Sequence, residues 1–156
     1  MDRRVILDAN VLWSPQQRII VLQTALKLDI ALHWTPLIVE EWLRNVDAVQ
    51  RAKSEARTIP LMERHFPRAC LPTVPPAPCG TTDPKDRHVA AAAVRIAPAT
   101  LVTWNLRDFD AAALKAADVD LRTPDRFLSD LHDRYPDLVM EAAREAQANL
   151  SRSAPT

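Results

Sequence analysis

Short apolar runs rich in β-branched residues alternate along the chain with longer segments whose apolar residues recur at helical spacing. The predicted strands are 4–8, 30–34, 100–104 and 119–122. The predicted helices are 15–28, 36–49, 47–64, 84–97, 111–117, 124–133 and 136–149. Strands that alternate with helices predict an α/β fold, with a mainly parallel sheet flanked by helices on both faces and a C-terminal helical extension.

The placement of the prolines supports this division, since the chain has 13 prolines and one glycine. Proline is favoured at the first helical position, after a Ser, Thr or Asp cap. Four predicted helix starts fit this template: Ser14-Pro15, Thr35-Pro36, Asp83-Pro84 and Thr123-Pro124. Ser14 also has Gln17 three residues later, which predicts a capping box. Pro60 is instead expected to break or kink the helix over 47–64.

Length and composition predict one globular domain, because 156 residues suffice for a sizeable core. We expect this domain over 1–130, and a C-terminal helix with a frayed tail over 131–156. No apolar run approaches the roughly 20 residues of a membrane span, and the early first strand leaves no room for a signal peptide. A cytoplasmic location is expected, in which Cys70 and Cys79, beside an irregular loop over 70–80, are free thiols.

The formal net charge is zero, which excludes attraction of the whole molecule to polyanions but leaves local basic patches open. The basic excess over 44–68 is interpreted as a solvated helix face. His65 and His88 are interpreted as surface side chains, with a role as proton shuttles as the alternative. Trp104 is expected to pack against the protein.

Two aspartates follow predicted strands. Asp8 ends the first apolar run in VILDANVL, and Asp108 comes shortly after LVTW. The carboxyl ends of parallel strands meet at one end of an open α/β sheet, where ligands bind. We therefore expect both carboxylates at that end.

Asp86 is a third candidate, near the start of the helix predicted over 84–97. One reading is that Asp83 caps this helix while Asp86 favours the positive end of its dipole. At 100° per residue, however, Asp86 lies about 20° from Ala93, on the apolar stripe of the helix. A core-facing charge is costly unless it is paired or metal-bound, which favours a functional role.

The fourth candidate lies in TPLIVEEWLRNV, which offers Glu40 or Glu41. Glu40 points roughly 160° away from the apolar stripe of this helix, into solvent. Glu41 lies about 100° from the stripe, at its border, from which a carboxylate can reach a crevice. Periodicity therefore favours Glu41. Four carboxylates without a cysteine–histidine cluster favour Mg²⁺ or Mn²⁺, and the matching chemistry is metal-assisted phosphodiester hydrolysis.

VILDANVL, the glutamate of LIVEEWLRN, DPKDRHVAAAAV and LVTWNLRDFD resemble, in order and spacing, the four acidic blocks of PIN-domain ribonucleases. That group includes the VapC-type toxins of bacterial toxin–antitoxin pairs. The resemblance runs from about Val5 to Phe127 and would make 1–130 a PIN-like nuclease domain. It implies a homodimeric, Mg²⁺- or Mn²⁺-dependent endoribonuclease that cuts RNA and is held inactive by an antitoxin protein.

The resemblance also implies roles for individual residues. Asp8, Glu41, Asp86 and Asp108 would hold the metal, and Asn10 and Thr103 would support them by hydrogen bonds. Many family members carry an aspartate where this chain has Asn105, and an amide is a poorer ligand for a hard dication. The candidates for RNA contacts are Lys85, Arg87 and Arg107, which could equally offset the repulsion among the acids.

Two other functions remain open. A non-catalytic PIN-like adaptor that binds RNA or protein would share this fold. A phosphotransfer domain would use Asp8 as the phosphate acceptor, but the chain lacks the second acid expected beside it.

Overall fold

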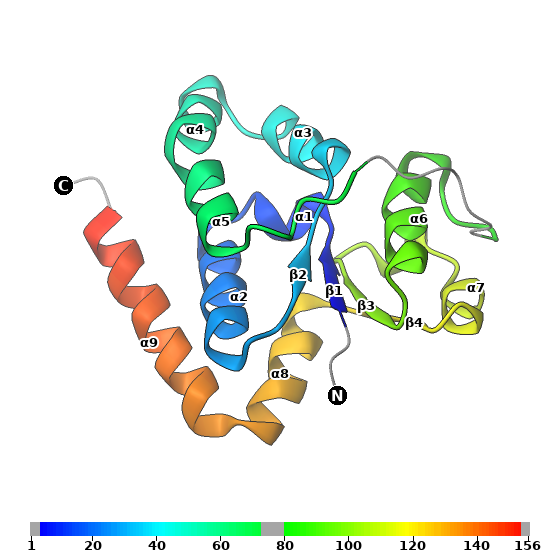
Figure 1. The fold of residues 1–156 in the computed structure, drawn as a ribbon. Coiled ribbons are helices and arrows are strands. Elements are labelled where there is room, and N and C mark those ends of the chain that lie inside the picture. The colour runs from blue at the N-terminus through cyan, green and yellow to red at the C-terminus, as the bar shows by residue number, and fades with distance from the viewer. Residues whose placement is uncertain (1–3, 73–79, 154–156) are drawn as a thin grey trace.

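A four-stranded parallel sheet forms the centre of the protein in the computed structural model, which describes residues 4–72 and 80–153 (Figure 1). Its spatial order is β2-β1-β3-β4. The strands are β1 (Arg4–Leu7), β2 (Leu32–His33), β3 (Ala99–Val102) and β4 (Val119–Arg122). All the strand pairs are parallel, which confirms the predicted α/β class.

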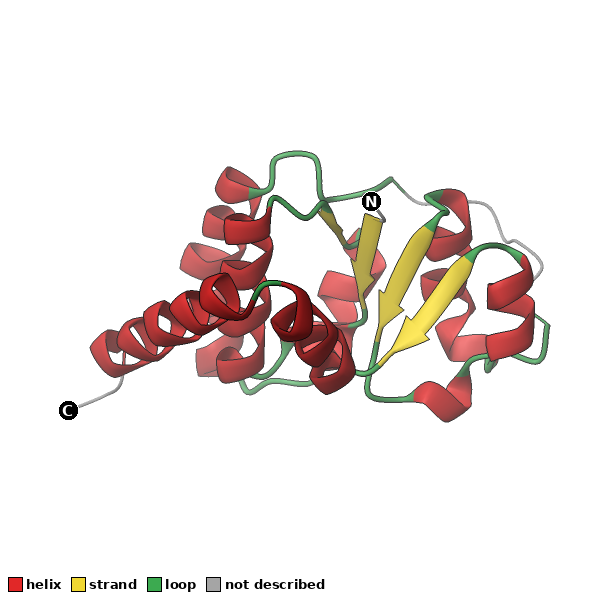
Figure 2. Cartoon of the chain, turned by 90° about the horizontal axis from the view of Figure 1, so that it is seen from below, coloured by secondary structure: helices red, strands yellow, loops and turns green. Residues whose placement is uncertain are grey.

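Nine α-helices surround this sheet in the described ranges. They are α1 (Ala9–Leu12), α2 (Pro15–Leu28), α3 (Pro36–Arg44), α4 (Ala48–Lys53), α5 (Ile59–His65), α6 (Arg87–Arg95), α7 (Ala111–Ala116), α8 (Pro124–Arg134) and α9 (Pro136–Ser153). Helices α6 and α7 lie to one side of the sheet, and α2 and α8 lie to the other (Figures 1 and 2). Helix α9 packs along α2, so the C-terminal extension is an intrachain packing helix.

The predicted helix caps are confirmed at three of four positions. Thr35 and Thr123 accept hydrogen bonds from the backbone N–H of Ile38 and Arg126, and Asp83 accepts from that of Lys85. The predicted capping box at Ser14 is wrong, since its side chain makes no cap hydrogen bond. The side chain of its expected partner Gln17 instead accepts a hydrogen bond from the Trp104 indole.

Two helices differ from the prediction: the one predicted over 36–49 is shorter, and the one predicted over 47–64 is not broken at Pro60. Helix α3 stops at Arg44, because the N–H of Asn45 bonds to the carbonyl of Trp42 and Asp47 caps the next helix. No break occurs at Pro60. A π-helical turn over Ser54–Thr58 joins α4 to α5, and the proline falls in the first turn of α5, where its missing N–H costs little.

Two short helical turns at strand ends were not predicted. Helix α1 follows β1 directly, and the 3₁₀ turn η3 (Leu106–Asp108) follows β3. The helix predicted over 84–97 is a 3₁₀ turn, η2 (Pro84–Asp86), followed by α6. These turns are too short for helical periodicity to reveal, yet η2 and η3 hold two of the four candidate acids, Asp86 and Asp108.

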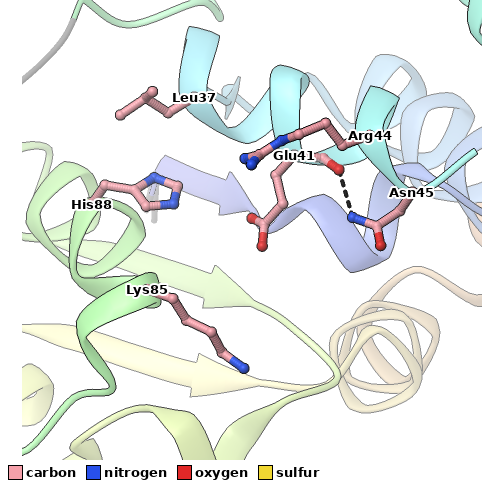
Figure 3. A pocket seen from close by; sticks show the side chains of 6 residues that line it. All are labelled: Leu37, Glu41, Arg44, Asn45, Lys85 and His88. Carbon is pink, nitrogen blue, oxygen red and sulfur yellow. Dashed lines mark hydrogen bonds between the residues drawn. The ribbon is translucent and has the colours of Figure 1, made fainter.

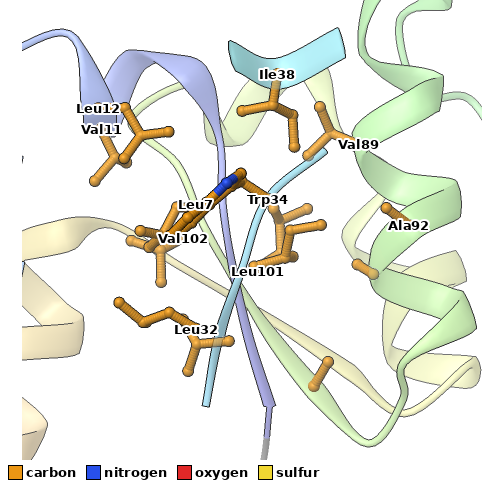
Figure 4. Packing of buried hydrophobic residues seen from close by; sticks show 14 of the residues in the cluster. Leu7, Val11, Leu12, Leu32, Trp34, Ile38, Val89, Ala92, Leu101 and Val102 are labelled. Atoms are coloured by element: carbon orange, nitrogen blue, oxygen red, sulfur yellow. The ribbon is translucent and has the colours of Figure 1, made fainter. Parts of the chain in front are cut away.

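The core consists of the apolar side chains of the strands and of the helix faces that cover them (Figure 4). Trp34 and Trp42 are among the largest fully buried side chains, and Trp34 meets Phe66 edge-on at 6.2 Å between ring centroids. Trp34 is therefore a core residue. No helix in the described ranges is long and apolar enough to cross a membrane.

Some predictions fall on residues that lie outside the described ranges 4–72 and 80–153. Cys70 is a free, exposed thiol, but Cys79 lies in 73–79, outside the described residues, as does much of the loop predicted over 70–80. The frayed tail is predicted for 151–156; helix α9 continues to Ser153, and 154–156 lie outside the described residues. The predicted boundary between 1–130 and 131–156 falls within α8.

Candidate functional site

The register of β1 and β3 brings Asp8 and Thr103 together. Leu7 lies opposite Val102 at the ends of these two strands, and Asp8 and Thr103 are the residues that directly follow them. The Thr103 hydroxyl donates to Asp8 Oδ2 at 2.8 Å, and the backbone N–H of Ala9 donates to Asp8 Oδ1 at 2.8 Å. Asp8 is 2% exposed, so its carboxylate is fixed in a buried position.

Asn10 ties the two strand ends together. Its amide Nδ2 donates to Thr103 Oγ1 at 3.0 Å and to Asp8 Oδ2 at 3.3 Å. Its Oδ1 accepts from the backbone N–H of Trp104 at 3.1 Å. The backbone N–H of Asn105 also donates to Thr103 Oγ1, at 3.1 Å, while the Asn105 residue is exposed. Asn10 and Thr103 thus lie beside Asp8 as supporting residues would.

Asp86 and Asp108 come from two segments that hydrogen bond to each other. The backbone N–H of Asp83 donates to the Asp108 carbonyl at 2.8 Å, and that of Asp110 donates to Thr82 Oγ1 at 3.0 Å. Asp110 in turn caps α7 by accepting from the N–H of Ala113. The turn η2, which ends at Asp86, is therefore fastened beside η3, which ends at Asp108.

The single glycine makes the close approach of these segments possible. Gly80 has φ +58°, and a Cβ at this position would lie 2.0 Å from Asp110 Oδ2. The same Oδ2 accepts from the backbone N–H of Thr81 at 3.0 Å. Any side chain at position 80 would displace Asp110, and with it the contact that aligns η2 and η3.

Glu41, not Glu40, faces the other acids. Glu40 is exposed and lies 3.4 Å from Arg51, on the solvent side of α3. Glu41 is half-buried, and its carboxylate reaches into a pocket of about 470 Å³ between α3 and the start of α6 (Figure 3). This is the orientation that helical periodicity predicted for Glu41.

The four carboxylates influence one another through their charges. Burial raises the pKa of Asp86 to about 7, helped by the charges of Asp8, Asp108 and Glu41. Burial and the charge of Asp8 raise the pKa of Glu41. Burial also raises the pKa of Asp8, although the hydrogen bond from Thr103 opposes it. The structure thus gathers all four predicted acids in one electrostatically coupled group.

The donor set fits a hard dication such as Mg²⁺ or Mn²⁺, which prefers carboxylate oxygens. Glu41 Oε2 and Asp86 Oδ2 are buried without a hydrogen-bond partner, so each has a free lone pair. Within the described ranges, no three Asp, Glu, His or Cys side chains are already arranged to hold one metal ion. A bound ion would therefore have to draw these carboxylates closer together.

The predicted RNA-contact residues differ in their surroundings. Lys85 is exposed and lies 3.8 Å from Asp108, so it offsets part of the acidic charge. Arg87 donates from Nε to the Thr82 carbonyl at 3.2 Å, a contact within the segment that carries Asp86. Arg107 is exposed on η3.

The pocket also contains two residues that are not among the predicted metal ligands, supporting residues or RNA contacts. Arg44 and His88 line it together with Glu41 and Lys85 (Figure 3). The interpretation of His88 as a surface side chain is wrong, because it is half-buried and its Nδ1 is buried without a partner. Arg44 follows Glu41 by three residues, one helical turn, and this spacing is a signal that could have identified it.

Arg18 is a second residue that sequence reasoning missed. It is 9% exposed, donates to the Leu12 carbonyl at 2.6 Å and lies 5.0 Å from the Trp42 ring centroid. Burial lowers its pKa to about 10. Arg18 therefore joins α1, which follows Asp8, to α3, which carries Glu41, by a carbonyl contact and a cation–π contact.

A comparison with known proteins gives one partial likeness. Over 51 residues the chain is 49% identical to a protein of Mycobacterium tuberculosis (strain ATCC 25618 / H37Rv) named "Putative ribonuclease VapC50". The match covers 33% of this chain and 30% of that protein, so the chain is matched to less than a third of its relative's length. No family model matches the chain, and no solved structure matches it. The likeness suggests a VapC-like family, in line with the resemblance of the acidic blocks.

Proposed function

We propose that this protein is an endoribonuclease that hydrolyses RNA phosphodiester bonds with the help of Mg²⁺ or Mn²⁺. The observation that carries the proposal is the group of four coupled carboxylates, in which Asp86 has a pKa of about 7 and two buried oxygens lack partners. Such groups cost stability in the metal-free protein and are typical of functional sites. A dication among them would offset their repulsion.

The side chains divide into three roles in this proposal. Asp8, Glu41, Asp86 and Asp108 would hold the metal, which when bound activates water and offsets charge on the phosphate. Thr103 and Asn10 hold the Asp8 carboxylate in one orientation through the hydrogen bonds described above. Lys85 and Arg44, on opposite sides of the pocket, would attract the phosphates that flank the cleaved bond.

We further propose that the protein acts in the cytoplasm as the toxin of a type II toxin–antitoxin pair. The support is the partial likeness to a protein named as a VapC ribonuclease, together with the resemblance of the acidic blocks. An antitoxin protein would then be its partner, and the protein would be a homodimer. In this proposal the nuclease domain is 1–130, and 131–156 form the C-terminal helix and tail of the same domain.

Cleavage of RNA by the purified protein tests the proposed activity. We expect cleavage with Mn²⁺ or Mg²⁺ that a chelator abolishes, and at least a 100-fold loss in Asp8→Asn. Loss of an outer-shell partner alone typically costs 10- to 100-fold, and Asp8 would be a direct ligand. Glu40→Gln is the matched control, because Glu40 is the neighbour of Glu41 on the solvent side of α3.

Two outcomes would contradict the proposal. Equal cleavage by the wild type and Asp8→Asn, or cleavage that survives the chelator, would show that the acids do not act through a metal. Binding of RNA without cleavage, with either metal and across several classes of RNA, would instead favour the non-catalytic adaptor.

A further inference from the structure

Trp104 presents an exposed aromatic ring at the edge of the acidic group. It follows Thr103, the residue that hydrogen bonds to Asp8, and it is 41% exposed. The expectation that Trp104 packs against the protein is therefore wrong for much of its surface. Trp34 and Trp42 are 1% and 0% exposed, so the core already has its large aromatic side chains without Trp104.

Two hydrogen bonds hold this exposed residue in place. Its backbone N–H donates to Asn10 Oδ1 at 3.1 Å, and its indole Nε1 donates to Gln17 Oε1 at 2.6 Å. The only polar atom of the ring is thus satisfied within the protein, while part of the ring remains accessible. A ring fixed in this way loses little conformational freedom when a ligand covers it.

The surroundings of Trp104 favour a nucleic acid as that ligand. Asn10 links Trp104 to Asp8, since its side chain accepts from the Trp104 backbone N–H and donates to the Asp8 carboxylate. The exposed Arg107 follows three residues later in the chain. The exposed Lys85 lies beside Asp108. Fixed aromatic rings beside cationic side chains bind single strands, because the bases stack on the ring while the cations attract the phosphates.

We propose that Trp104 is a stacking platform for an unpaired nucleobase next to the phosphodiester bond on which the acids act. This inference rests on the proposed function and narrows its substrate to RNA that is unpaired at the site of cleavage. Bases within an A-form duplex are stacked on each other and cannot cover the ring. A loop or a single strand can present one base to it.

A binding experiment tests the proposal without depending on cleavage. Trp104→Ala, Trp104→Leu and Trp104→Phe are made in an Asp8→Asn background, which keeps the RNA intact. Binding of a fluorescent single-stranded oligoribonucleotide is measured with Mg²⁺ present. We expect about 5- to 150-fold weaker binding for the alanine and leucine variants, and a much smaller change for phenylalanine, which keeps a ring. Tyr135→Ala is the control, since this aromatic is 46% exposed and lines a different cavity.

Single abasic sites moved along the oligonucleotide identify the stacked base. One abasic position is expected to weaken binding in the Asp8→Asn protein, and to have little further effect once Trp104 is alanine. Gln17→Leu, which frees the indole without removing it, is expected to weaken binding less than Trp104→Ala does. Circular dichroism verifies that each variant is folded.

Several outcomes would overturn the inference. The first is equal binding by the Asp8→Asn parent and by the same protein with Trp104→Leu. The second is that the effects of the abasic sites and of Trp104→Ala simply add. The others are binding of a duplex as tight as that of the single strand, or no RNA binding at all. Loss of self-association in Trp104→Leu, with RNA binding unchanged, would assign the ring to a protein contact instead. If RNA is never cleaved but its binding depends on Trp104, the proposed nuclease activity fails and the stacking platform stands.

Discussion

Charged side chains are paired with opposite charges at the contact between α2 and α9, whereas in the acidic group they lie beside like charges. At the helix contact, Lys27 Nζ lies 3.0 Å from Glu141 Oε1 and 2.9 Å from Glu145 Oε1, with all three side chains partly exposed. In the acidic group, like charges are gathered at buried or half-buried positions, and the nearest cation, Lys85, lies 3.8 Å from Asp108 on the exposed side.

This difference separates charges that serve stability from charges that serve a site. Hydrogen bonds to Glu145 and Glu141 raise the pKa of Lys27, so the two glutamates favour its ionised form. Asp86 has its pKa raised by burial and by three like charges, so folding disfavours its ionised form. Carboxylates whose ionised form is disfavoured by folding reduce the stability of the protein, and such groups are typical of functional sites.

The largest predicted effect is a fall in the stability of the metal-free protein as the pH rises. The pKa of Asp86 is 3.8 in the unfolded chain and about 7 in the folded protein. Between these values the unfolded chain holds fewer protons, so the free energy of unfolding decreases from about pH 4 to pH 7, by on the order of 2–4 kcal/mol. Denaturant unfolding at several pH values in a chelator measures it, and Mn²⁺ is expected to reverse the loss. A stability that rises with pH across this window would contradict the electrostatic picture.

A smaller effect is expected when one acid of the group loses its charge. Asp86→Asn should raise the free energy of unfolding of the metal-free protein at pH 8 by about 1–3 kcal/mol, because a buried charge beside three like charges is removed. The same variant should lose the stabilisation by Mn²⁺. Glu40→Gln serves as the control, since Glu40 is exposed and paired with Arg51. Destabilisation by Asp86→Asn under these conditions would speak against unfavourable burial of its charge.

The smallest effect is predicted at the helix contact. Lys27→Met should lower the free energy of unfolding only slightly, by less than the change expected for Asp86→Asn, because the two ion pairs that are lost are exposed and exposed pairs contribute little. Added salt should reduce the difference between this variant and the wild type. Thermal unfolding at low and high salt measures both. A loss of stability that added salt does not reduce would mean that α9 depends on Lys27 for more than its charge.

Much of the fold could be predicted from local chemistry. The cap-and-proline pairs at Thr35, Asp83 and Thr123 fixed three helix starts, and alternation of strands and helices indicated the parallel sheet. The helical position of Glu41 set it apart from Glu40, since one residue of rotation separates the solvent from the crevice. These features depend on spacing along one element, which the sequence displays directly.

The remainder depends on contacts between elements far apart in the chain. The orientation of the Trp104 indole depends on Gln17, 87 residues earlier, which accepts its hydrogen bond. Gln17 is therefore not used for the cap that its spacing from Ser14 predicts. The half-buried position of His88 depends on α3 facing the start of α6 across the pocket. No local pattern specifies which helices face each other.

The strand order has a consequence for a protein still being synthesised. Strand β1 is synthesised before both of its neighbours, β2 and β3, and Arg4 pairs with Ala99. Until β3 has been synthesised, one edge of β1 stays without its partner and Asp108 has not joined the other carboxylates. A chain that ends before β3 and η3 therefore cannot assemble the four acids, so any activity that needs all of them begins only after β3 has joined the sheet.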